Sequence, residues 1–175
     1  MLKELSLFSG YGGMTLGLRL AGWPVQTVAY VENDSWCQKV LQARMDDGSL
    51  DRGEIYGDIR KFKAERYAGE VDLVSAGFPC QPHSYAGSRL GESDPRNLWP
   101  ETREIIRVVG PEWVVLENVP GILSGNDGRQ GYGISVLGEL SELGFDARWG
   151  IHSAADAGAP HLRKRWWVLA HAQHQ

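Results

Sequence analysis

Residues 3–22 read KELSLFSGYGGMTLGLRLAG, and this stretch decides the fold. Lys3 to Leu7 is a short apolar run typical of a strand, and Gly13 to Ala21 has a helical pattern that Gly22 ends. The glycines between them predict a tight turn in which the backbone can approach a ligand closely. A strand, a Gly-rich turn and a helix in this order indicate the first unit of a parallel α/β sheet.

The rest of the chain continues this alternation of short apolar runs and helical patterns. Further strands are expected at Val25 to Val31, Val71 to Ala76 and Trp113 to Leu116. Further helices are expected at Asp34 to Arg44, with Asp34 or Ser35 as N-cap, at Leu98 to Val109, with Pro100 in its first turn, and at Ile134 to Leu143. Phe145 to Ile151 and Arg165 to Ala170 predict two strands added antiparallel at one side of the sheet. The expected fold is α/β: an open, mostly parallel sheet with helices on both faces.

Composition sets the broad class of the protein. A chain of 175 residues has the usual size of a single domain, and no apolar run is long enough to cross a bilayer. Two cysteines and no secretory leader pattern favour a reducing cytoplasm over a disulfide framework. The net charge of −4 argues against a free-standing DNA binder, so either the partner is not nucleic acid or the basic surface lies elsewhere. A local concentration of positive charge is Arg163-Lys164-Arg165.

Residues suited to ligand binding or catalysis follow the predicted strands. In an open parallel sheet, ligands bind beyond the carboxyl ends of the strands. The segments found there are Phe8 to Gly13, Glu32, the pair Asp58-Ile59, Phe78-Pro79-Cys80, and Glu117-Asn118. The sequence therefore predicts a functional site along this edge of the sheet.

The Gly-rich turn and Glu32 suggest a cofactor that carries a nucleoside. Glu32 follows the turn at about the spacing at which an acidic residue meets ribose hydroxyls in dinucleotide folds. Thr15 replaces the third glycine of the dinucleotide fingerprint, however, and a plain strand-to-helix turn is the alternative interpretation. The five histidines show no metal-ligand spacing, so no metal site is predicted.

Cys80 and Glu117 form a candidate catalytic pair. Cys80 follows a proline and opens a loop, whereas Cys37 lies inside a predicted helix and is interpreted as a packing residue. A free thiol with a pKa of about 8.5 is only slightly ionised at neutral pH, so an attacking cysteine also needs a group that activates its target. Glu117, at the end of a buried strand, could supply that group or could simply cap the following turn.

Taken together, these residues resemble the DNA (cytosine-5) methyltransferase family over nearly the whole chain. The motifs that carry the resemblance are Leu5 to Gly13, Gly77-Phe78-Pro79-Cys80-Gln81-Pro82, Glu117-Asn118-Val119 and Pro160 to Arg165, in this order. The resemblance implies a Rossmann-like fold and S-adenosylmethionine as cofactor. It assigns cofactor binding to Phe8, Gly10, Gly12, Gly13, Glu32, Asp58, Ile59 and Pro79, and catalysis to Cys80, Glu117, Arg163 and Arg165.

The implied reaction is methyl transfer to carbon 5 of a cytosine flipped out of double-stranded DNA. Cys80 would add to carbon 6 while Glu117 acts at ring N3, and the two arginines would hold the flipped nucleotide. Alternation along one strand is expected to put both arginines on the same face. Pro82 to Asn97 would form a loop over the substrate, with Gly87 and Gly91 as hinges.

The chain also departs from the family pattern. Ser6 stands where many members carry Asp, and His83 and His161 stand where Phe and Gln are usual. The resemblance implies that family members continue into a target-recognition domain and a final segment that completes the cofactor pocket, and we expect neither within these 175 residues. We therefore expect an uncovered apolar face, and either a truncated product or one half of a two-chain enzyme whose partner carries recognition.

Three other functions stay open at this point. A tRNA cytosine methyltransferase shares the same core, and a catalytically silent module could bind cofactor or partner proteins. An oxidoreductase that binds a nicotinamide dinucleotide is a more remote alternative, which Thr15 and the Cys80–Glu117 pair disfavour.

Overall fold

The computed structural model describes residues 1–79, 97–124 and 131–173. Its strands are β1 (Leu2–Leu7), β2 (Val25–Val31), β3 (Glu54–Tyr56), β4 (Leu73–Ala76), β5 (Trp113–Asn118), β6 (Phe145–His152) and β7 (Arg165–Ala172). Its α-helices are α1 (Gly13–Leu20), α2 (Ser35–Asp46), α3 (Trp99–Val109) and α4 (Tyr132–Glu142). Short 3-10 helices are η1 (Ile59–Lys61), η2 (Ala64–Tyr67), η4 (Pro120–Leu123) and η5 (Ala155–Ala157).

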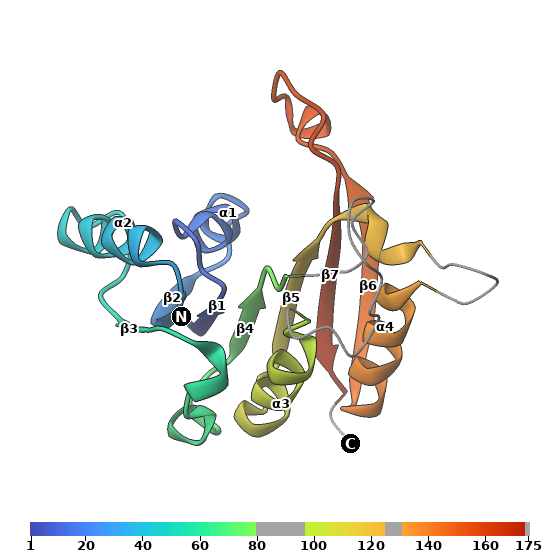
Figure 1. The fold of residues 1–175 in the computed structure, drawn as a ribbon, viewed down its shortest axis with the longest axis horizontal. Helices are drawn as coiled ribbons and strands as arrows, with labels where there is room; N and C mark the ends of the chain where they lie inside the picture. The colour runs from blue at the N-terminus through green and yellow to red at the C-terminus, as the bar shows by residue number, and fades with distance from the viewer. Residues whose placement is uncertain (80–96, 125–130, 174–175) are drawn as a thin grey trace.

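The strands form one sheet in the order β3-β2-β1-β4-β5-β7-β6 (Figure 1). β1 to β5 run parallel, and β7 pairs antiparallel with both β5 and β6. The predicted α/β fold and the antiparallel addition are thus confirmed. The chain proceeds outward from β1 to β3 and then returns to β4 on the other side of β1. The gap between β1 and β4 is therefore a topological switch point, where open α/β sheets bind ligands.

Helices cover both faces of the sheet, as the core clusters show. Leu5 and Leu7 of β1 belong to a core cluster that also contains Ile106 of α3 and Val136 of α4. Met14 and Leu18 of α1 pack on the opposite face, in a cluster that includes residues of β2, β4 and β5. Because side chains alternate along a strand, the apolar runs of β1, β4 and β5 supply both layers.

Sequence patterns located all four α-helices and six of the seven strands in the described residues. Asp34 is the N-cap of α2, where it accepts hydrogen bonds from Trp36 N and Cys37 N, and Gly22 ends the turn after α1 at φ 86°. The clearest difference is that β3 had no predicted counterpart, and the ends of the other elements, such as the start of β4 at Leu73 rather than Val71, differ from the expected ones by at most two residues. β3 has only three residues, too few to show a periodicity of two.

An arm of residues 153–164 links β6 to β7 and projects beyond the sheet (Figure 1). Ala154 N donates to Leu162 O at 2.8 Å and closes the arm at its base. Ser153 N donates to Asp156 Oδ2 at 2.7 Å, and this backbone hydrogen bond lowers the pKa of the Asp156 carboxyl. The arm is therefore an ordered hairpin end.

An uncovered apolar hollow lies on the α1 side of the sheet. It measures about 360 Å³ and is lined by Leu18, Trp23, Val115, Trp167 and Leu169, among others. The hollow is mostly apolar, and its expected role as the face that a further segment covers stays a prediction. None of the helices in residues 1–79, 97–124 and 131–173 has both the length and the apolar character that a membrane span needs.

Candidate active site

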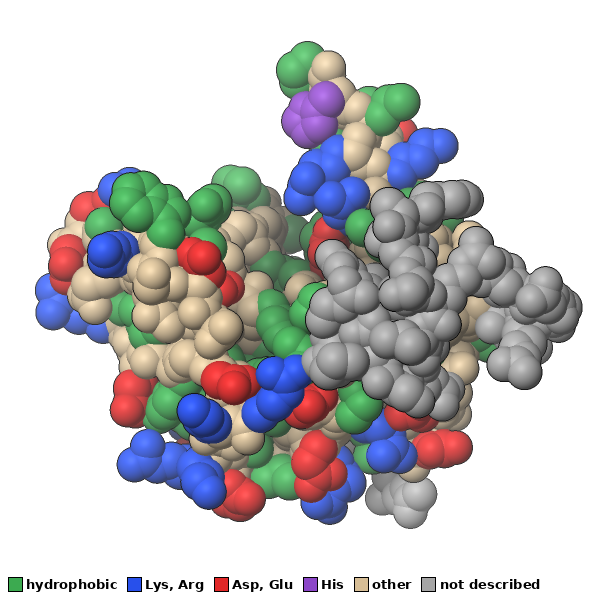
Figure 2. All heavy atoms as spheres, in the orientation of Figure 1, with side chains coloured by type: hydrophobic (Ala, Val, Ile, Leu, Met, Phe, Trp, Pro, Cys, Tyr) green, Lys and Arg blue, Asp and Glu red, His purple; other side chains and the backbone are tan. Residues whose placement is uncertain are grey.

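A pocket of about 530 Å³ opens at the carboxyl ends of β1, β4 and β5, beside the base of the arm (Figure 2). Its lining residues are Phe8, Ser9, Gly13, Met14, Gly77, Glu117, His152, Ser153, Ala154, Ala157, Arg163, Arg165 and Trp167. Five residues assigned from the sequence thereby meet in one place, although they are far apart along the chain: Phe8, Gly13, Glu117, Arg163 and Arg165. Figure 2 shows Lys and Arg side chains gathered at the base of the arm, next to this recess.

Glu117 and Arg165 form an ion pair in the pocket wall. Arg165 Nε lies 2.6 Å from Glu117 Oε1, and the exposed fractions of the Arg165 and Glu117 side chains are only 22% and 23%. Oε2 of the same carboxyl faces Gly77, where an added Cβ would lie 3.5 Å away. Because Gly77 has no side chain, this second oxygen borders open space. The carboxyl is thus fixed through one oxygen and can hydrogen-bond a ligand through the other.

Arg163 lines the pocket, but the structural reason for its position differs from the predicted one. β7 begins at Arg165, so Arg163 lies in the arm, and strand alternation does not place it. Its backbone has φ 35°, a left-handed conformation that is uncommon for a residue with a side chain. The expected joint placement of the two arginines is present, but the expected reason is wrong: the turn at the end of the arm aims Arg163 at the pocket.

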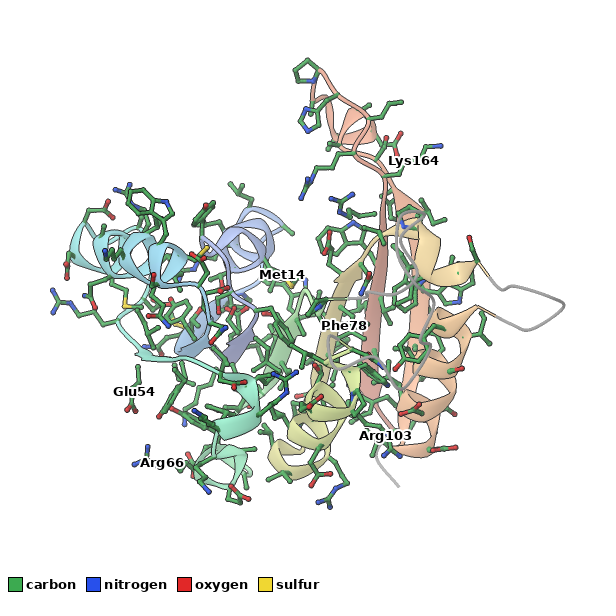
Figure 3. All side chains as sticks on the ribbon, viewed as in Figure 1. Met14, Glu54, Arg66, Phe78, Arg103 and Lys164 are labelled. Atoms are coloured by element: carbon green, nitrogen blue, oxygen red, sulfur yellow. The ribbon has the colours of Figure 1, made fainter. Side chains whose placement is uncertain are left out.

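Cys80 and the predicted loop from Pro82 lie outside the described residues, apart from Asn97. The segment that leads to Cys80 is described as far as Pro79, which is half-buried. Asn118 Nδ2 donates to Phe78 O at 2.8 Å, and the Phe78 ring packs on Trp99 with centroids 5.2 Å apart. Figure 3 labels Phe78 beside the end of β4. The residues just before the candidate nucleophile are therefore held next to Glu117's own strand.

Glu32 is oriented by backbone hydrogen bonds at the end of β2. Gly10 N donates to its Oε2 and Asp34 N donates to its Oε1, each at 2.8 Å. Gly10 has φ 53°, and no atom lies within 4 Å of the position its Cβ would occupy. Such a turn keeps one side of its backbone open, and the fixed carboxyl retains lone pairs for further donors. This carboxylate could therefore accept hydrogen bonds from the two neighbouring hydroxyls of a ribose.

Asp58 and Ile59 follow β3 and lie on the same edge as Glu32, because Glu32 N donates to Tyr56 O across the neighbouring strands. Asp58 caps η1 by accepting from Arg60 N at 3.0 Å. Ile59 is buried in the core, with 6% of its surface exposed, so its side chain serves packing.

Gly12 of the Gly-rich turn has a packing role as well, because a Cβ there would lie 2.6 Å from Leu50 Cδ1.

Several pocket residues were not predicted. Met14 of α1 lies across the pocket from the arm, as its label in Figure 3 helps to locate, and Trp167 lies next to Glu117 in the β5–β7 register. Trp167 could have been found, because it is two residues beyond Arg165 and so shares its face of β7. His152 and Ala154 carried no sequence signal. Within the described ranges, no group of three or more His, Cys, Asp or Glu side chains could hold a metal ion.

Comparison with known proteins finds a family model that matches nearly the whole chain. The family model described as C-5 cytosine-specific DNA methylase matches residues 2–175. The Type II methyltransferase M.NgoMIV of Neisseria gonorrhoeae is 35% identical over 162 residues, which are 93% of this chain and 49% of that protein. M.AquIA of Picosynechococcus sp., another Type II methyltransferase, is 32% identical over 95% of this chain and 71% of its own length.

Solved structures agree on the fold. A DNMT2 mutant of Spodoptera frugiperda has a TM-score of 0.77 at 22% identity, over 98% of this chain and 50% of that one. A putative DNA modification methyltransferase from an E. coli prophage also has a TM-score of 0.77, at 25% identity over 98% of this chain and 47% of that one. The chain thus spans about half the length of most of these relatives.

Proposed function

The chain belongs to the C-5 cytosine-specific DNA methylase family, and from this premise we propose that it transfers a methyl group from S-adenosylmethionine to carbon 5 of cytosine in double-stranded DNA. The observation that supports this proposal best is the pocket that holds the Glu117–Arg165 ion pair and is also lined by Phe8 and Gly13. A base activated by the carboxyl would lie beside the turn proposed to bind the cofactor. Methyl transfer requires this adjacency.

The residues at the ends of β1, β2 and β3 fit a nucleoside-bearing cofactor. Glu32, fixed by two backbone donors, would accept hydrogen bonds from the ribose hydroxyls. Phe8 and Pro79 would pack against the adenine, and Asp58 would bind its polar edge with the Ile59 backbone. Gly10 and Gly13 leave open space for the rest of the molecule, since no atom lies within 4 Å of either Cβ position. When bound, S-adenosylmethionine supplies an electrophilic methyl group.

Cys80 and Glu117 would make the cytosine reactive. The Cys80 thiolate adds to carbon 6, forming a carbon–sulfur bond, while the Glu117 carboxyl donates a proton or hydrogen bond at N3. Electron density then moves to carbon 5, which becomes nucleophilic enough to accept the methyl group. Loss of the carbon 5 proton to a base and expulsion of the thiolate restore the aromatic ring. Arg165 would keep Glu117 pointing at the base, and Arg163 would hold the flipped nucleotide from the arm.

We also propose that a segment outside these 175 residues covers the α1-side hollow and that recognition of the target sequence lies outside them too. The hollow and the active-site pocket share His152 and Trp167, so an element packed in the hollow would reach the cofactor pocket. A longer product or a second chain could supply it. The net charge of −4 agrees with a DNA-reading surface on another part of the enzyme.

Covalent trapping tests the chemistry directly. Duplex DNA containing 5-fluorocytosine cannot lose a proton from carbon 5, so with S-adenosylmethionine it should leave an adduct on Cys80 that mass spectrometry can locate. The Cys80→Ala variant should give none, and an adduct that persists in this variant would refute the proposed nucleophile. An RNA duplex or tRNA of matched sequence is the second arm, and trapping there in place of DNA would assign the RNA substrate.

A further inference from the structure

A carboxyl group with no part in the proposed chemistry is buried beneath α1. Glu4 of β1 is 0% exposed, which is rare for a glutamate. Its Oε1 accepts a hydrogen bond from Ser75 Oγ at 2.6 Å. Its Oε2 accepts from Thr27 Oγ1 at 2.6 Å and from Thr15 Oγ1 at 2.8 Å. The donors come from β4, β2 and α1, so one side chain of β1 joins four elements.

The bond to Thr15 is the main buried attachment of α1. Thr15 is the only fully buried residue of that helix, and the N-cap residue makes no side-chain hydrogen bond. Met14 and Leu18 pack on the sheet but stay partly exposed. Leu16 is 38% exposed and Leu20 is 90% exposed. A helix with so little apolar burial depends more than usual on its polar contacts, which are the buried bond of Thr15 and the partly exposed ion pair of Arg19 with Asp51.

α1 continues directly from the turn of residues 8–13. Gly12 N donates to Ser9 O inside this turn, and Leu16 N donates to Gly12 O where the helix begins. A shift of the first helical turn would therefore move Gly13, which lines the active-site pocket. Thr15, whose hydroxyl is bonded to Glu4, lies only two residues after Gly13.

We propose that Glu4 is a positioning residue for the turn of residues 8–13, acting through Thr15. The effect on cofactor binding rests on the proposed function, whereas the hydrogen bonds of Glu4 are independent of it. It also explains a departure seen in the sequence: Thr15 occupies the place of a third glycine because its hydroxyl anchors the helix. Glycine there would leave a Glu4 oxygen with one donor fewer in a buried position.

Two matched variants separate positioning from plain stabilisation. Thr15→Val and Thr27→Val each remove one hydroxyl donor from the same Glu4 oxygen, and Thr15 and Thr27 are only 0% and 1% exposed. Both variants should lower global stability by similar amounts. Amide hydrogen exchange of residues 9–16 should accelerate by about three- to ten-fold in Thr15→Val and stay near wild type in Thr27→Val, when both are compared at equal global stability. Equal exchange in the two variants would overturn the proposal.

Titration with S-adenosylmethionine adds the functional readout. Thr15→Val should weaken binding by about three- to ten-fold relative to Thr27→Val, and Thr15→Ser, which keeps the hydroxyl, should restore it. Binding that falls equally in both valine variants would make the cluster purely structural. If the wild-type chain binds no S-adenosylmethionine, the proposed cofactor site fails on its own, and the exchange measurement still decides the role of Glu4.

Discussion

The three glycines of the turn should respond very differently to alanine. Gly12 has φ 81°, and a Cβ there would lie 2.6 Å from Leu50 Cδ1. The left-handed backbone costs a residue with a side chain about 1 kcal/mol, and crowding a packed leucine costs about 1–3 kcal/mol. Gly12→Ala should therefore lower the free energy of unfolding by about 2–4 kcal/mol, or the thermal midpoint by about 5–15 °C.

Gly10 and Gly13 provide the contrast. Gly10 has φ 53° but no atom within 4 Å of its Cβ position, so Gly10→Ala should cost only the backbone component of about 1 kcal/mol. Gly13 is the first residue of α1 with an ordinary φ and open space around it, so Gly13→Ala should be neutral or slightly stabilising. Because Gly13 lines the pocket, the added methyl should weaken S-adenosylmethionine binding about tenfold by crowding the ligand.

Urea denaturation and calorimetric titration of the three variants measure both quantities. A double-mutant cycle with Leu50→Val isolates the clash, because valine lacks the Cδ atoms that the new Cβ would meet. In that background the cost of Gly12→Ala should fall to the backbone component of about 1 kcal/mol. The reasoning would be refuted if Gly12→Ala cost the same in both backgrounds, or if Gly13→Ala bound the cofactor as tightly as wild type.

Three further outcomes are expected. Glu117→Gln should slow methyl transfer by about 10²–10⁴-fold in a labelled-methyl assay with little change in cofactor affinity, and full activity would remove this carboxyl from the chemistry. Asn118→Ala deletes the buried donor to Phe78 O and should lower stability by about 1–3 kcal/mol in urea, whereas an unchanged midpoint would show that the bond contributes nothing. The pKa of Asp34 is lowered chiefly because Cys37 N donates to its carboxyl. This stabilisation is present above the unfolded pKa of about 3.9 and is lost as the pH falls through the lower folded value, so the thermal-midpoint gap between wild type and Asp34→Ala should shrink between about pH 7 and about pH 2.5. A constant gap would contradict it.

Local patterns predicted the framework because each regular element repeats a simple chemical rule. α3 could be read from a proline in its first turn, its apolar face and Gly110 after its end, and the structure places Gly110 at φ 62° as the C-cap. β3 could not be read, since its three residues gain their strand character from pairing with β2. Tertiary contact decides such a segment, and no contact is visible in a single sequence.

The site was predicted to the extent that its residues follow strands. Glu32 and Glu117 lie at the ends of β2 and β5, so the topology of a parallel sheet brings them to one edge. Glu4 shows what this reasoning misses: a glutamate is normally exposed, and only the meeting of three hydroxyls from distant parts of the chain makes its burial stable. Trp167 is a different case, because its face of β7 could be inferred from Arg165 and only its place beside Glu117 depends on the register between β5 and β7.

Backbone conformation gives an independent indication of where function lies. Within the described ranges, two non-glycine residues have positive φ, Phe8 at 52° and Arg163 at 35°, and both line the active-site pocket. Each such conformation costs about 1–3 kcal/mol and persists only where neighbouring contacts fix it. Phe8 packs against the core at the end of β1. Arg163 lies between the bond from Ala154 N to Leu162 O and the ion pair of Arg165, so the chain is held on both sides of it. Both residues with strained backbone therefore line one pocket, as is common at functional sites.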